Sequence, residues 1–167
     1  MIHIYTGNGK GKTTAALGLA IRAAGAGLKV FIGQFAKGTK CSELAALRKF
    51  KNITLKQFGS GCFIINEVKL KDRQLAKAGL KELQKILAQN RYQVVILDEI
   101  NIAVDLGLIN AAQVISLAKK CNKTTELILT GRNAPREIVA IADLITEMKE
   151  IKHYFNKGVI ARKGIEY

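Results

Sequence analysis

The sequence predicts an α/β fold in three layers, with helices on both faces of a mostly parallel sheet. Two observations lead to this prediction. Short apolar runs alternate with helical patterns along all 167 residues, which is the order that βαβ units produce. A loop rich in glycine and lysine also joins the first apolar run to the first helical pattern. No repeat, linker or low-complexity segment interrupts the alternation, so we expect one domain over residues 1–167.

Five apolar runs are predicted as strands. They are rich in β-branched or bulky side chains and end at glycine, polar or charged residues, as strands do. They cover residues 2–5, 30–32, 53–55, 94–97 and 127–129.

Helical patterns separate these runs. Residues 12–25 are rich in alanine and leucine, and we expect Gly18 and Gly25 to let this helix lie close to the sheet. Residues 70–90 repeat leucine and isoleucine at helical spacing with charges between them.

Two further helices are predicted from their start signals. Asn110 is a suitable N-cap for a third helix. Pro135 fits the first turn of a fourth, where its missing N–H costs nothing. The tail, residues 149–167, is predicted as a turn followed by a short strand.

The chain is strongly basic. Its 27 Lys and Arg against 13 Asp and Glu give a formal net charge of +14, and clustered basic residues bind polyanions. Many lysines, however, such as Lys71, Lys77, Lys81 and Lys85, fall on the polar face of the predicted helix 70–90, where solvation accounts for them. Aromatic residues do not alternate with the basic ones as surfaces for single-stranded nucleic acid require. We therefore do not expect a nucleic-acid partner.

Several classes of protein are excluded by composition. No apolar run approaches the ~20 residues of a membrane-spanning helix, so no membrane partner is expected. His3 and the loop from Gly7 leave no room for a secretory signal, which predicts a cytoplasmic protein. Three cysteines without a CxxC pair, and two histidines, predict reduced thiols and no zinc site; the cysteines are Cys41, Cys62 and Cys121.

The first predicted strand runs into a phosphate-binding loop, Tyr5-Thr6-Gly7-Asn8-Gly9-Lys10-Gly11-Lys12-Thr13-Thr14. Glycines let the backbone wrap a phosphate, and the helix N-terminus and a lysine add positive charge. Lys12 is expected to reach the phosphates and Thr13 to ligate Mg²⁺. Thr6 stands at the usual first glycine, so we expect a tighter cradle, with Lys10 as a second cation. A glycine-rich turn that merely caps a helix is the alternative.

Acidic and basic partners follow two later strands. Asp98 and Glu99 end the apolar run 94–97, as a Walker B acid does. In P-loop proteins in general, the first acid, here Asp98, binds Mg²⁺ and the second, here Glu99, activates water. The alternative is an ordinary pair of acids at the end of a strand. Arg132 follows the strand 127–129 at the same expected edge and can reach a nucleotide. A surface arginine that closes a turn is the alternative.

These residues resemble the ATP:cob(I)alamin adenosyltransferases of the CobA/BtuR class, which are small P-loop proteins of RecA-like fold. The resemblance runs the length of the chain, and the shortened GNGKGKTT loop is its most specific part. The other matching residues are Gln34-Phe35, Lys37-Gly38, Leu97-Asp98-Glu99, Thr130-Gly131-Arg132, Ala142-Asp143-Leu144, Glu147-Met148, Lys152-His153 and the ending from Gly158 to Tyr167.

The resemblance implies an unusual reaction for a P-loop protein. Cobalt(I) of a reduced corrinoid attacks C5′ of ATP, which lies in the loop in reversed orientation, and inorganic triphosphate leaves. It implies that Lys12, Glu99 and Arg132 are catalytic and that Mg²⁺ or Mn²⁺ is held by Thr13 and Glu99, with Asp98 beside them. It also implies an electron donor such as a reduced flavoprotein, and a homodimer. The implied ATP-binding residues are Gly7, Asn8, Gly9, Lys10, Gly11, Lys12, Thr13 and Thr14.

Two features depart from the family pattern. Relatives often carry a basic N-terminal extension that helps cover the active site, whereas here the first strand begins at residue 2, so we expect a lid from elsewhere. Relatives also place Gly-Phe-x-Trp in the loop that faces the corrinoid. This chain has Gly61-Cys62-Phe63-Ile64 there, which makes Cys62, Phe63 and Ile64 the candidate corrinoid contacts.

Two other functions compete with the transferase. A P-loop ATPase or kinase would use Glu99 or Asp98 to activate water or an acceptor hydroxyl and would release phosphate or diphosphate. A non-catalytic module, gated by nucleotide, would bind a corrinoid or nucleic acid without turnover.

Overall fold

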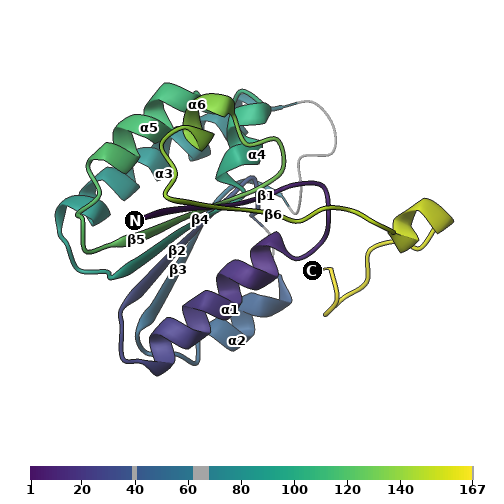
Figure 1. Ribbon diagram of the computed structural model, residues 1–167, viewed down its shortest axis with the longest axis horizontal. Helices are drawn as coiled ribbons and strands as arrows, with labels where there is room; N and C mark the ends of the chain where they lie inside the picture. Colours follow the sequence, from purple (N-terminus) through teal and green to yellow (C-terminus); the bar gives the residue numbers. More distant parts are fainter. Residues whose placement is uncertain (39–40, 62–67, 167) are drawn as a thin grey trace.

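The computed structural model describes residues 1–38, 41–61 and 68–166. Within these residues lies a sheet of six strands, all parallel, in the order β3-β2-β4-β5-β1-β6 (Figure 1). The strands are β1 (Ile2–Thr6), β2 (Val30–Phe35), β3 (Ile53–Phe58), β4 (Val94–Asp98), β5 (Glu126–Thr130) and β6 (Leu144–Glu147).

Helices cover both faces of the sheet, which confirms the predicted three-layer α/β fold. α1 (Lys12–Gly25) and α2 (Ser42–Leu47) lie on one face. The other face carries α3 (Leu70–Ala88), α4 (Ile100–Asp105), α5 (Ala111–Lys119) and α6 (Arg136–Val139) (Figure 1). None of the helices formed by the described residues is long and apolar enough to cross a bilayer.

The central strands are buried on both faces, as parallel strands between two helical layers are. In β4, Val94 and Ile96 pack in the core beneath α1, while Val95 and Leu97 pack in the core beneath α3 and α5. This double burial explains the uninterrupted apolar run before Asp98. Because every strand is parallel, the loops after β1, β4 and β5 meet at one edge of the sheet, where ligands of such folds bind.

The predicted elements are confirmed at five strands and four helices, α1, α3, α5 and α6. The cap of α5 is as expected, since the Asn110 side chain accepts a hydrogen bond from the Gln113 N–H at 2.9 Å. Pro135 stands one position before α6 instead of in its first turn. The elements α2, α4 and β6 were not predicted. The two helices have six residues each, which is less than two turns, and all four residues of β6 are exposed, so it lacks the buried apolar run of the other strands.

The prediction for the tail was wrong. A 3₁₀ helix, η1 (Tyr154–Lys157), stands where a turn was expected, and the described residues 158–161 are exposed and form no strand. The edge of the sheet beside β1 is already taken by β6, which pairs with it from His3 to Thr6. β6 is thus the edge strand of the sheet, and the described residues after η1 do not pair with it.

The close approach of a helix to the sheet occurs at a glycine other than the two expected. A Cβ on Gly18 or Gly25 would meet nothing within 4 Å, whereas one on Gly79 would lie 2.5 Å from Cγ of Phe58. The expectation for α1 was wrong because its alanines, such as Ala16 and Ala20, make the buried contact. Gly79 lets α3 lie directly on the ring of Phe58 in β3.

Candidate active site

The loop between β1 and α1 is wound tightly around the start of α1. Gly7 and Gly11 adopt φ values of 93° and 119°, in the left-handed region that favours glycine. A Cβ on Gly7 or Gly9 would lie 2.5 or 2.6 Å from the carbonyl oxygen of Met148. The glycines thus supply the backbone turn of a phosphate cradle, and Gly7 and Gly9 leave room for the segment after β6 to lie against the loop.

Lys12, the first residue of α1, points into this loop. Its Nζ donates hydrogen bonds to the carbonyl oxygens of Gly7 and Gly9, each at 2.7 Å. The side chain is buried, and burial together with the nearby charge of Arg132 lowers the pKa of its ammonium. Lys12 therefore places a buried positive charge at the centre of the cradle.

Asp98, at the end of β4, is completely buried and fully hydrogen-bonded. One carboxylate oxygen accepts from the hydroxyls of Thr13 and Thr130, at 2.8 and 2.7 Å. The other accepts from Nζ of Lys37 and Nε2 of Gln34, at 3.0 and 3.3 Å. Burial alone would lower the pKa of Lys37, but the neighbouring carboxylates outweigh it and raise that pKa. With both oxygens engaged, Asp98 orients the Thr13 hydroxyl.

Glu99 follows at a strained position, with φ 59°. Its N–H donates to the Thr130 hydroxyl at 3.0 Å, which fixes the backbone there. Among the described residues its carboxylate makes one long ionic contact, 3.9 Å from Nζ of Lys37. Burial, and then the charge of Asp98, raise the pKa of Glu99. Glu99 is thus the acid of the pair whose oxygens stay available for a ligand.

Arg132 joins the same group of residues from the loop after β5. Gly131 turns the chain there with φ 130°, and its carbonyl accepts from Nδ2 of Asn101 at 3.3 Å. The exposed Arg132 lies near enough to lower the pKa of Lys12 and to oppose the rise in that of Glu99. The structure therefore gathers at one sheet edge the predicted residues Lys12, Thr13, Asp98, Glu99 and Arg132.

The oxygen donors at this edge fit a magnesium-type ion. Mg²⁺ is usually bound by one or two carboxylates, substrate phosphates and water. Thr13 and Glu99 offer a hydroxyl and a carboxylate of that kind beside the cradle. No cluster of three or more His, Cys, Asp or Glu side chains occurs in the described part of the chain, so a metal here would need phosphate and water ligands as well.

Lys10 faces a different part of the molecule. Its Nζ donates to the Tyr154 hydroxyl at 2.9 Å and to Glu166 Oε1 at 2.7 Å. Three glycines of the loop, Gly7, Gly9 and Gly11, also lie against Met148, which a Cβ on any of them would approach within 3.2 Å. The Gly9 N–H donates to the carbonyl oxygen of Met148 at 2.6 Å. The C-terminal segment thus lies against the loop on the side to which Lys10 points.

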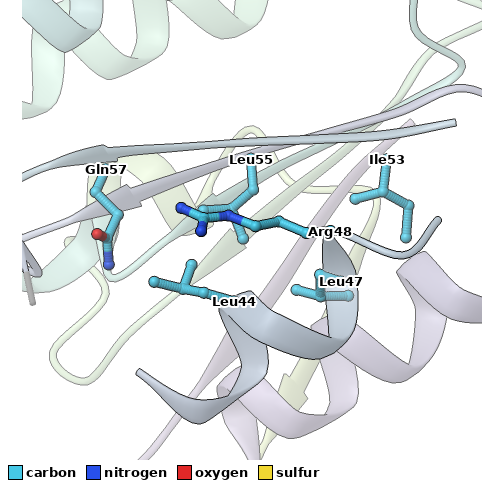
Figure 2. Close-up of a pocket in the computed structure, with 6 residues that line it drawn as sticks. All are labelled: Leu44, Leu47, Arg48, Ile53, Leu55 and Gln57. Carbon is cyan, nitrogen blue, oxygen red and sulfur yellow. The ribbon is translucent and has the colours of Figure 1, made fainter. Parts of the chain in front are cut away.

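The candidate corrinoid contacts Cys62, Phe63 and Ile64 lie outside the described residues. A pocket elsewhere, between α2 and β3, is lined by leucines and isoleucine, with the Arg48 side chain running along it toward Gln57 (Figure 2). No residue of the phosphate loop or of the acidic pair lines it. Gln57 links this pocket to the site, because its Nε2 donates to Gln34 Oε1 at 3.1 Å.

Sequence reasoning assigned no role to several residues that shape the site. Gln34 and Lys37 bind Asp98, and Thr130 binds both acidic residues. The signal for Gln34 was present, because a glutamine in a strand with every residue buried must find a polar partner. Glu166 gave no such signal, since its partner Lys10 is 156 residues away.

The phosphate loop follows β1, and the buried Asp98, which is bonded to Thr13 of that loop, ends β4. One further strand, β5, lies between β1 and β4 in the parallel sheet. These features define a P-loop nucleotide-binding protein. The family model for ATP:corrinoid adenosyltransferase BtuR/CobO/CobP matches residues 1–167. The chain belongs to this family.

Individual relatives agree with the family model. The corrinoid adenosyltransferase of Pseudomonas aeruginosa is 34% identical over 98% of this chain and 82% of its own length. Corrinoid adenosyltransferase CobA of Salmonella typhimurium is 34% identical, over 100% of this chain and 85% of its own. The corrinoid adenosyltransferase of Escherichia coli is 32% identical over the same shares.

Proposed function

We propose that this member of the family transfers the 5′-deoxyadenosyl group of ATP to cobalt(I) of a reduced corrinoid. The cobalt–C5′ bond forms as the C5′–O5′ bond breaks. The electron pair of the broken bond leaves on O5′ with inorganic triphosphate. The observation that carries the proposal is the buried Lys12 inside the loop, next to the Thr13–Asp98 hydrogen bond and Glu99.

The residues of the site would act by positioning and by neutralising charge. Cobalt(I) is itself a strong nucleophile, so the protein needs to align it with C5′ and to stabilise charge on the leaving group. Lys12, Arg132 and the backbone N–H groups at the start of α1 suit the triphosphate, which is the group that gains charge. Glu99 has no water to activate in this reaction, so its role is to bind metal.

We assign the metal ion, Mg²⁺ or Mn²⁺, to Thr13 and Glu99, with Asp98 holding the Thr13 hydroxyl in place. When bound, the ion would neutralise charge on the triphosphate. We also propose that a reduced flavoprotein supplies the electron to the corrinoid. A homodimer is proposed as well, supported by exposed apolar side chains, Leu144 and Ile145, on the edge strand β6.

The test follows the corrinoid. Chemically reduced cob(I)alamin is mixed anaerobically with the protein, ATP and MgCl₂, and the visible spectrum is recorded before and after illumination. The proposal predicts a light-sensitive organocobalt product whose formation needs ATP and metal. Unchanged cob(I)alamin with ATP cleaved to ADP and phosphate would show an ATPase instead, and binding without turnover would show a carrier.

A further inference from the structure

The C-terminal segment is fastened to the phosphate loop at two points. The first is at Met148, just after β6, where the carbonyl oxygen accepts from the Gly9 N–H at 2.6 Å. The second is near the end of the chain, where Oε1 of Glu166 accepts from Nζ of Lys10 at 2.7 Å. Between these points the segment leaves the sheet, forms η1 and returns to the start of α1 (Figure 1).

The second fastening is built from four side chains. The Tyr154 hydroxyl accepts from Lys10 at 2.9 Å and donates to Glu166. The Arg162 N–H donates to Oε2 of Glu166 at 2.7 Å, and the guanidinium lies 4.9 Å from the centre of the Tyr154 ring. We call Lys10, Tyr154, Arg162 and Glu166 the tail cluster. Charge-assisted hydrogen bonds of this kind are stronger than neutral ones.

The contacts separate the two lysines of the loop. Lys12 turns inward to the carbonyl oxygens of Gly7 and Gly9, whereas Lys10 turns to the tail. The backbone of Met148 and Lys149 also lies against the loop, where a Cβ on Gly9 would come within 2.6 and 2.9 Å of it.

We propose that Glu166 is a positioning residue for ATP binding. Through Lys10, Glu166 holds the phosphate loop in the conformation that binds ATP. A loop this rich in glycine loses much backbone freedom when it becomes ordered around phosphate. Contacts that fix it beforehand reduce that cost of binding. The inference rests on the proposed function, because it assumes that the triphosphate of ATP lies in this loop.

The test compares Glu166→Gln with Glu150→Gln, a matched control on the same segment whose side chain contacts Asn156 and not the loop. Glu166→Gln is expected to raise the KM for ATP and the dissociation constant of inorganic triphosphate by about fivefold each, the upper value for a solvent-exposed ion pair. The KM for the corrinoid and the melting temperature should stay within about twofold and a few degrees of wild type. Glu150→Gln should change none of these.

A double-mutant cycle with Lys10→Gln tests the route of the effect. If Glu166 acts through Lys10, Glu166→Gln should have little further effect in the Lys10→Gln background, and Glu166→Asp should restore part of the affinity. An unchanged ATP KM would overturn the proposal. Tighter triphosphate binding would overturn it too, because Glu166 would then compete with the phosphates. Equal losses for ATP and corrinoid with a lowered melting temperature would show a purely structural contact.

Triphosphate binding is measured by calorimetry without corrinoid, so the result does not depend on adenosyl transfer. Weak binding in Glu166→Gln with no transfer in the wild type would contradict the proposed reaction and leave the role of Glu166 intact.

Discussion

At the scale of single residues, the two lysines and the two acids of the site differ in what they already bind. Lys12 donates to carbonyl oxygens within the loop, and Glu99 makes one long ionic contact. Lys10 is bonded instead to the C-terminal segment, and Asp98 is paired with Lys37. Sequence spacing alone could not make this distinction, because each pair shares one motif. The contacts in the folded structure separate the two lysines and the two acids from each other.

Replacement of Lys12 by alanine tests the cradle. We expect Lys12→Ala to lower kcat/KM by about 100- to 1000-fold, as removal of one charge-stabilising donor does. Initial rates of organocobalt formation measure the loss. Lys71→Ala, an exposed lysine on α3, is the control and should keep wild-type rates. Rates near wild type for Lys12→Ala would contradict the assignment of the loop to triphosphate.

The two acids should fail in different ways. Glu99→Gln is expected to raise the Mg²⁺ concentration needed for half-maximal activity by about tenfold, because a metal-bound carboxylate oxygen becomes a neutral amide. Its melting temperature should change little. A titration of activity against MgCl₂ measures the shift.

Asp98→Asn is expected instead to lower the free energy of unfolding by about 3 kcal/mol, because Lys37 loses its close carboxylate partner in a buried position. Denaturant unfolding measures this loss. If Asp98→Asn alone changes the Mg²⁺ requirement, the metal is bound by Asp98 and our assignment is reversed.

At the scale of elements, the sequence predicted those helices and strands whose positions depend on a local pattern of residues. The strands and the helices α1, α3 and α5 have clear periodicity or a clear cap, and they lie where expected. The helices α2 and α4 are less than two turns long and show no period, and β6 is exposed throughout and has no buried apolar run. The path of the tail depends on the tail cluster, which joins Lys10 to Glu166 across the chain, so no local pattern could predict it.

Helix packing gives a test at this scale. Gly79→Ala places a methyl group 2.5 Å from Cγ of the buried Phe58, and we expect the free energy of unfolding to fall by about 1–3 kcal/mol. Gly18→Ala is the matched control on α1, where a Cβ meets nothing within 4 Å. It should raise stability by about 0.5–1 kcal/mol, because alanine favours the helix. Equal effects in denaturant unfolding would contradict the close contact of α3 with β3.

At the scale of the whole molecule, the parallel sheet brings distant segments to one edge. The chain as a whole carries a net charge of +14, which attracts anions in general. Much of this charge lies on exposed lysines, including those of α3. The charge favours a polyphosphate ligand without specifying it, because the specific contacts come from the cradle.

The charge also yields a prediction about nucleic acid. We expect a fluorescent single-stranded oligonucleotide to bind with a dissociation constant of about 10⁻⁴ to 10⁻⁶ M at physiological salt, as non-specific contacts do. Fluorescence anisotropy over a salt series measures it. Binding in the nanomolar range that ATP competes away would indicate a nucleic-acid partner at the site itself.

The phosphate product tests the central claim most directly. Anaerobic single-turnover reactions with cob(I)alamin, ATP and MgCl₂ are quenched, and inorganic triphosphate, diphosphate and phosphate are separated and counted against the organocobalt formed. We predict one triphosphate for each organocobalt product and no ADP. Organocobalt without equal triphosphate, or ATP cleaved to ADP and phosphate, would contradict attack at C5′ and with it the mechanism assigned to this site.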